Sequence, residues 1–168
     1  MAPVQHQRFS RTLVWAACAA GTVHAAFSLY WAFGGRWLLS TVGNWAVDYA
    51  ARAPLEAGLL LGTVGIVKLL AAATPVAVIY GQVPWPRFWR AVCWIGGMFL
   101  VLYGAANAAA GAAVLAGVIR PADGYDAAMI GHSLLWDPLF LIWGAALCLA
   151  LRFSRRAAGS PKASENLP

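Results

Sequence analysis

Four long apolar stretches, at about residues 12–33, 55–80, 91–119 and 127–153, most constrain what this chain can fold into. Each is long enough to cross the hydrocarbon core of a bilayer, about 30 Å thick, as an α-helix that rises about 1.5 Å per residue. Of the 168 residues, 61% are hydrophobic and only 11% are charged, which is too apolar for the surface of a soluble domain. The sequence therefore predicts an all-α polytopic membrane protein, a four-transmembrane-helix bundle with short loops.

The charges predict how the four spans are oriented. Arginines gather at one set of span ends, and the basic residues at the other ends are balanced by acidic ones. The first group is Arg8, Arg11, Arg87, Arg90, Arg152, Arg155 and Arg156, and the acidic residues are Asp48, Asp123 and Asp126. By the positive-inside rule, we expect a cell-membrane protein with both termini in the cytoplasm. Since the net charge of +6 forms no basic face with interleaved aromatic residues, nucleic acid is excluded as a partner.

Besides the turns predicted at 81–90 and 120–126, three segments lie outside the spans. Residues 1–10 are expected to form a cytoplasmic tail, and residues 154–168 a disordered cytoplasmic tail rich in Ser, Gly and Pro. Residues 34–54 mix Trp and Tyr with both signs of charge, which is typical of a segment in the membrane interface. This segment is either a short interfacial helix or a plain connector.

Metal and disulfide chemistry have little support. The three cysteines, Cys18, Cys93 and Cys148, all fall within predicted spans and lack CxxC spacing. Their odd number and their spacing argue against a disulfide framework and against a zinc site. We therefore expect no metal site.

The stretch from His132 to Gly144 is chemically unusual for a membrane span. It carries His132, Asp137 and Pro138 within seven positions of an apolar run. Ionisable groups in hydrocarbon cost several kcal/mol unless they are paired or wetted. Asp137 is therefore a candidate functional residue.

Lys68, near the middle of the second span, needs a partner for the same reason. Counted along the spans, Lys68 and Asp137 lie within about one helical turn of each other in depth. The sequence predicts an ion pair between them, with either a functional role or a purely structural one.

Other polar residues are expected at compatible depth. In the first span, His24 shares one helix face with Gly21, Ser28 and Trp31. Depth counting places His24, Tyr103, Asn107 and His132 in the outer half of the membrane. These residues predict a polar pocket that opens toward the outer leaflet, although for either histidine taken alone a packing role is favoured over a role as ligand or base. The stripe of Trp136, Phe140 and Trp143 is either helix packing or a ligand wall.

Several of these motifs resemble those of one protein family. They are His24 with Tyr30-Trp31-Ala-Phe-Gly34-Gly35, Val67-Lys68-Leu69, Leu102-Tyr103-Gly104, and His132-x3-Trp136-Asp137-Pro138-x-Phe140-x2-Trp143-Gly144. Together they resemble a family of small four-span bacterial membrane proteins, mainly actinobacterial, catalogued as a domain of unknown function. The resemblance covers most of residues 11 to 153. It implies the four-helix fold and no particular activity.

The pocket suggests binding of an apolar isoprenoid-, quinone- or lipid-like molecule, or acid/base chemistry on it. His24, His132 and Asp137 would serve as acid/base groups and Lys68 as charge partner. The remaining predicted ligand-binding residues are Tyr103, Asn107, Trp136 and Trp31. The chain contains no signature of a soluble enzyme class, and whether it is an enzyme stays open.

Three alternatives remain. A non-catalytic accessory or scaffold subunit would bind a partner membrane protein, or a second copy of the chain, through its glycine-rich faces. Haem b, held by His24 and His132, is disfavoured by their expected depth offset of about 5 to 10 Å. A small transporter built around Lys68 and Asp137 would be expected to contain inverted repeats, and the sequence has no convincing one.

Overall fold

The computed structural model describes residues 3–119 and 127–158, and every regular element in these ranges is helical. The elements run in the order α1 (Pro3–Ala32), η1 (Leu39–Thr41), α2 (Asn44–Arg52), α3 (Pro54–Ile79), α4 (Pro86–Leu115), α5 (Ala127–Gly131), η2 (His132–Trp136) and α6 (Asp137–Ala158). The predicted all-α class is confirmed.

Four helical segments are long and apolar enough to cross a membrane. They are Val4–Ala32, Pro54–Ile79, Pro86–Leu115 and Ala127–Arg155, the last of which joins α5, η2 and α6. This confirms a polytopic membrane protein with four spans.

The ends of the helices differ in part from the predicted boundaries. Helix α1 begins at Pro3 rather than near residue 12, because its first turns pack on α6, where the ring centroids of Phe9 and Phe153 are 5.0 Å apart. Helix α6 likewise extends to Ala158. Residues 154–158 of the tail predicted at 154–168 are therefore helical rather than disordered. The turn predicted at 120–126 and the rest of that tail, residues 159–168, lie outside the described residues.

Helix α1 packs along both α3 and α6, and small residues allow the close approach. A Cβ atom added at Gly21 would lie 2.7 Å from the Cβ of Ala72 on α3. One added at Gly65 would lie 2.7 Å from the side chain of Leu29 on α1. Helix packing in lipid depends on such close contacts, because lipid tails are as apolar as the side chains and supply no hydrophobic driving force.

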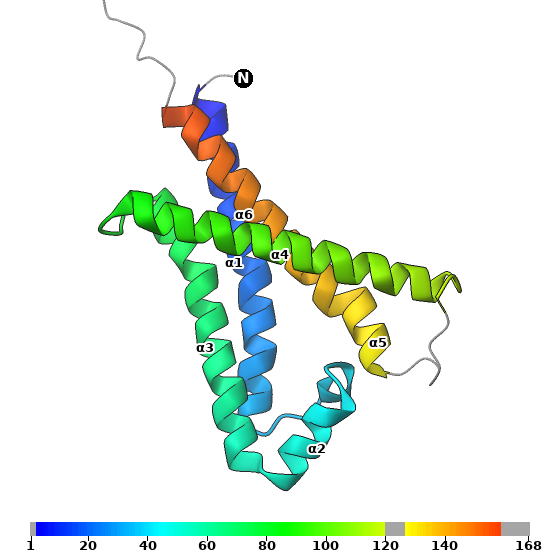
Figure 1. Ribbon diagram of the computed structural model, residues 1–168. Coiled ribbons are helices and arrows are strands. Elements are labelled where there is room, and N and C mark those ends of the chain that lie inside the picture. Colours follow the sequence, from blue (N-terminus) through cyan, green and yellow to red (C-terminus); the bar gives the residue numbers. More distant parts are fainter. Residues whose placement is uncertain (1–2, 120–126, 159–168) are drawn as a thin grey trace, which may run out of the picture.

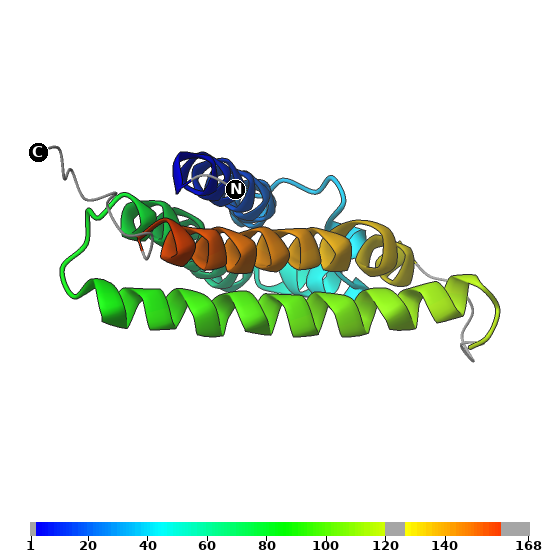
Figure 2. The same cartoon turned by 90° about the horizontal axis from the view of Figure 1, so that it is seen from above.

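Helix α4 does not run alongside α1. Figure 1 shows α4 crossing α1 and α3 at a steep angle, and Figure 2 shows α6 lying between α1 and α4. The buried residues of α4 are Cys93, Gly97, Gly104 and Gly111. An added Cβ at Gly104 would lie 2.6 Å from the backbone nitrogen of Leu141 on α6, so the α4–α6 crossing depends on glycine.

The connection between α1 and α3 contains η1 and the short helix α2, which confirms the helical alternative for residues 34–54. It folds back over the end of α1 and over η2. The indole Nε1 of Trp31 donates to the carbonyl oxygen of Trp37 at 2.8 Å, and that of Trp136 donates to Thr41 Oγ1 at 3.0 Å. Trp31, Leu39, Ala46 and Trp136 form a buried apolar cluster beneath this cap.

We predict that Gly104→Ala destabilises the protein by about 1–3 kcal/mol, because the new methyl group would clash with the α6 backbone rather than with a movable side chain. Gly96→Ala, on the same helix, is the control, since an added Cβ there meets no atom within 4 Å. Thermal unfolding in detergent, followed by circular dichroism, measures both. Equal midpoints for the two variants would contradict the close α4–α6 approach.

Candidate functional site

A π-helical turn, η2, interrupts the fourth span at its most polar point. The backbone N–H of Asp137 donates to the carbonyl oxygen of His132, five residues earlier. Pro138 follows directly and has no N–H, and its ring would clash with the carbonyl four residues earlier in a regular α-helix. A wider turn at this position relieves that clash. Such π turns are frequent at functional sites.

The turn brings His132 and Asp137 together. In an α-helix, residues five apart point about 140° away from each other, whereas a π turn stacks them more nearly one above the other. His132 Nδ1 lies 3.4 Å from Asp137 Oδ1. This contact is longer than a typical charge-assisted hydrogen bond of about 2.7–2.9 Å. The carboxylate is almost fully buried, with 3% of its side chain exposed, and the histidine side chain is 39% exposed.

Lys68 on α3 contacts α1 at two polar groups. Its Nζ lies 3.1 Å from His24 Nδ1 and 3.1 Å from Ser28 Oγ. The ring of Phe140 on α6 lies beside it, with its centroid 5.7 Å from Nζ, within the range of a cation–π interaction. Lys68 therefore lies where α1, α3 and α6 meet.

The contact with Lys68 determines which proton His24 carries. An ammonium group only donates, so it needs the lone pair of Nδ1, and a neutral imidazole then carries its hydrogen on Nε2. His24 is buried, with 5% of its surface exposed, and its Nε2 has no hydrogen-bond partner among residues 3–119 and 127–158. A buried N–H without a hydrogen-bond acceptor costs about 1–3 kcal/mol of stability. A ligand oxygen that accepts from Nε2 would remove this cost.

Except for Asp137, which lies behind His132, these polar residues line one cavity of about 240 Å³. His24, Ser28 and Trp31 come from α1, Lys68 from α3, and His132 and Trp136 from η2. The other lining residues are Val42, Trp45, Leu60, Leu61, Val64 and Phe140. Aromatic rings pack tightly around His24: its ring centroid lies 4.0 Å from that of Phe140 and 5.3 Å from that of Trp136. The cavity thus combines a mostly apolar wall with a few polar groups, as small-molecule sites do.

The predicted ion pair between Lys68 and Asp137 is wrong. Lys68 contacts α1, and Asp137 contacts His132 within its own span. Within residues 3–119 and 127–158, Lys68 has no carboxylate within ion-pair distance, since the ion pairs there are Arg52–Asp48 and His132–Asp137. Depth counting placed the two residues at one level but did not fix the direction in which each side chain points. The π turn then directs Asp137 to His132.

The remaining predicted residues divide into two groups. Trp31 and Trp136 line the cavity together with His24, Lys68 and His132. Tyr103 and Asn107 do not line it. Tyr103 is 40% exposed, stacks on Phe99 of its own helix and makes a T-shaped contact with Phe140. Asn107 Nδ2 donates to the carbonyl oxygen of Tyr103 on its own helix. The prediction assumed that α4 runs alongside α1, so that residues at a similar depth in the membrane would meet. Because α4 crosses α6 instead, Tyr103 and Asn107 lie away from His24.

Two kinds of residue were missing from the predicted site. Ser28 lies one turn from His24 on the same helix face. This spacing indicates that Ser28 could contact the same partner as His24, which is Lys68. Val42 and Trp45, in contrast, reach the cavity through the fold of the connection between α1 and α3, which carries no helical periodicity that points there.

The arrangement offers two chemical functions. Lys68 and His24 can donate hydrogen bonds to an acceptor in the cavity. His132 lies there as a candidate acid/base group, and the buried carboxylate of Asp137 can orient its ring. In the described part of the chain, no three His, Cys, Asp or Glu residues are grouped as a metal site.

Comparison with known proteins identifies the family. The family model described as "Protein of unknown function (DUF3995)" matches residues 21–147, which include every residue of the cavity. The chain belongs to this family. No curated protein and no solved structure matches the chain. The match to DUF3995 confirms the resemblance noted from the sequence motifs.

We predict that a double-mutant cycle in this DUF3995 protein will couple His132 to Asp137 but not Lys68 to Asp137. Residues in contact show interaction energies of about 0.5–3 kcal/mol, and independent residues add within about 0.5 kcal/mol. The cycle combines His132→Ala, Lys68→Met and Asp137→Ala, with unfolding by sodium dodecyl sulfate in mixed micelles as the measurement. Coupling of Lys68 with Asp137 above that level would restore the ion pair and contradict the observed geometry.

Proposed function

We propose that this protein binds an amphipathic, lipid-like molecule with an acidic head group within the membrane. The head group occupies the cavity formed by α1, α3 and the η2–α6 span, where Lys68 and His24 contact it. Of the isoprenoid-, quinone- and lipid-like molecules that the sequence suggests, those with an anionic head fit this cavity best.

One observation carries the proposal: the partly buried Lys68 has polar partners but no carboxylate partner among the described residues. A cation within the hydrocarbon layer is expensive and normally pairs with an anion. His24 and Ser28 accept its hydrogen bonds but supply no opposite charge. A phosphate or carboxylate on the ligand would supply that charge. A separate oxygen of the head group, beyond the anionic group itself, would accept from His24 Nε2.

The aromatic walls and the second polar pair support the same interpretation. Trp31, Trp136 and Phe140 provide rigid apolar surfaces for the part of the ligand next to its head. His132, backed by Asp137, lies in the same cavity and is suited to exchange a proton with an acidic head group.

The charge pattern supports an orientation for the site. With both termini in the cytoplasm of a cell-membrane protein, the cavity lies in the outer half of the bilayer. The connection that contains η1 and α2 covers it from the outside, and Val42 and Trp45 contribute to its wall. A ligand would then enter from the outer leaflet between the helices.

The test compares Lys68→Met with Lys162→Met, the same substitution at the only other lysine of the chain. Native mass spectrometry of protein extracted in mild detergent should find an acidic lipid retained by the parent and by Lys162→Met. Lys68→Met should lose it, with unchanged helix content by circular dichroism.

Two outcomes would contradict the proposal. In one, folded Lys68→Met retains the same molecules in the same amounts as the parent. In the other, the parent carries no lipid and co-purifies instead with another membrane protein at fixed stoichiometry, which would support an accessory role.

A further inference from the structure

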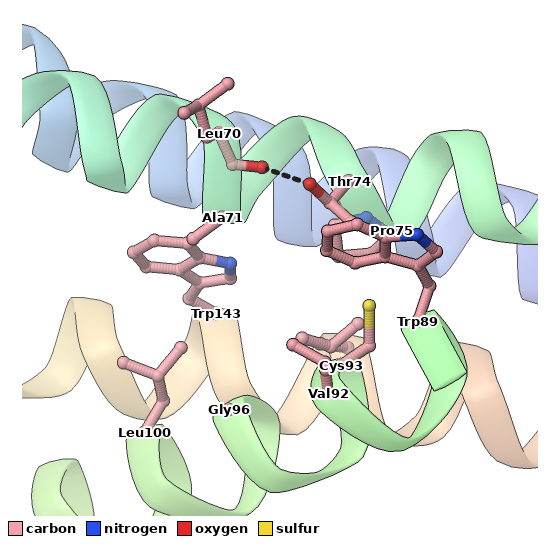
Figure 3. Close-up of a pocket in the computed structure, with 11 residues that line it drawn as sticks. Leu70, Ala71, Thr74, Pro75, Trp89, Val92, Cys93, Gly96, Leu100 and Trp143 are labelled. Atoms are coloured by element: carbon pink, nitrogen blue, oxygen red, sulfur yellow. Dashed lines mark hydrogen bonds between the residues drawn. The ribbon is translucent and has the colours of Figure 1, made fainter. Parts of the chain in front are cut away.

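A second cavity, of about 400 Å³, lies between α3, α4 and α6. Figure 3 shows side chains from the three helices pointing into it, among them Ala71 and Pro75 from α3, Trp89 and Cys93 from α4, and Trp143 from α6. Its lining consists almost entirely of carbon, and the hydroxyl of Thr74 is already used by the carbonyl oxygen of Leu70 at 2.7 Å. The cavity is therefore suited to hydrocarbon.

This apolar cavity continues the polar one along the same two helix faces. On α6 and η2, His132, Trp136 and Phe140 line the polar cavity, and Trp143 and Leu147 line the apolar one. These positions follow each other at spacings of three and four, so they form one stripe. On α3, Val64 and Lys68 are followed in the same way by Ala71 and Pro75. The stacked rings of Phe140 and Trp143, with centroids 6.3 Å apart, mark the junction.

The size of each cavity indicates what each can hold. The polar cavity, at about 240 Å³, is smaller than the roughly 300–1,000 Å³ of complete ligand sites. It has room for a head group but not for a long chain. The apolar cavity adds about 400 Å³ at the adjoining level, where no charged side chain lines it.

A buried donor in the apolar cavity also lacks a partner. Trp143 is 2% exposed, and its Nε1 has no hydrogen-bond acceptor in the part of the chain that the structure describes. Figure 3 shows this nitrogen on the side of the ring that faces the cavity. Pure hydrocarbon would leave the N–H unsatisfied, at a cost of about 1–3 kcal/mol. A ligand with an ester or ether oxygen between its head and its chain would satisfy it.

We propose that the two cavities together bind a single-chain acidic lipid whose chain is joined to its phosphate head through an ester or ether. This inference rests on the proposed function, because the head group lies at Lys68 and His24. The linking oxygen accepts from Trp143 Nε1, and the chain lies between α3 and α4. The recognised chemistry is that of an acyl- or alkyl-glycerol phosphate.

The test uses two probes: glycerol phosphate as the head alone, and palmitoyl-glycerol phosphate with a photoreactive diazirine in mid-chain. After irradiation in detergent and digestion, the label should map to residues 70–75 of α3 and 89–100 of α4. Excess palmitoyl-glycerol phosphate without the diazirine should compete it away. Calorimetric titration should show that binding of both probes is lost in Lys68→Met.

A cavity-filling variant separates the chain site from the head site. Gly96→Leu adds a side chain to the apolar cavity where an added Cβ meets no atom within 4 Å, so the fold should tolerate it. Ala106→Leu, an exposed position on α4 outside both cavities, is the control. Gly96→Leu should lower palmitoyl-glycerol phosphate binding about tenfold or more, because several methylene groups lose their burial. Glycerol phosphate binding should stay unchanged.

The outcomes distinguish the two proposals. If both probes bind through Lys68 but the label maps elsewhere and Gly96→Leu has no effect, the chain inference is overturned and the proposed function stands. If neither probe depends on Lys68, both proposals fail for phosphate-bearing ligands.

Discussion

An ammonium group within a membrane span must find hydrogen-bond partners, and the arrangement of α1, α3 and α6 provides them for Lys68. His24 and Ser28 can reach Lys68 only because α1 and α3 run in close contact. Gly21 and Gly65 permit that contact, since a Cβ at either position would overlap the opposite helix. Helix α6 then packs on α1 and places Phe140 against both members of the Lys68–His24 pair. The packing of small residues and the position of the buried cation are therefore parts of one arrangement.

The π turn η2 explains how the fourth span serves two purposes. Pro138 cannot continue the regular hydrogen-bond ladder, and the wider turn before it directs Asp137 back toward His132. The same turn carries Trp136, whose Nε1 donates to Thr41 and fastens the connection between α1 and α3 over the cavity. One irregular turn thus forms the carboxylate–histidine pair and holds the α1–α3 connection over one end of the site. A regular α-helix through these residues would separate His132 and Asp137 by about 140° around its axis.

The sequence predicted the helices well because length and hydropathy decide whether a segment can span a membrane. It also predicted the buried face of α1, since Gly21, His24, Ser28 and Trp31 follow helical spacing and all four are buried. It did not predict which polar groups meet. Depth along a span says nothing about the direction of a side chain, so Lys68 and Asp137 were paired wrongly. Comparing depths along spans also assumes that the helices are nearly parallel. Helix α4 crosses the others instead, so Tyr103 and Asn107 lie outside the site. The helical periodicity assumed for the fourth span failed at η2.

The separation of Lys68 from Asp137 leaves the charge of Lys68 without an opposite charge from Asp137. Had the two paired, the cavity would contain a neutral ion pair with little attraction for an acidic head group. Instead, the carboxylate is buried against His132, and the ammonium keeps only uncharged partners. In hydrocarbon, where electrostatic interactions are weakly screened, this leaves a local positive charge beside a donor without an acceptor, His24 Nε2. The same bundle places a carbon-lined cavity one helical turn farther along. The proposed binding of an acidic lipid therefore depends on all three features: the positive charge of Lys68, the donor without an acceptor and the neighbouring apolar cavity.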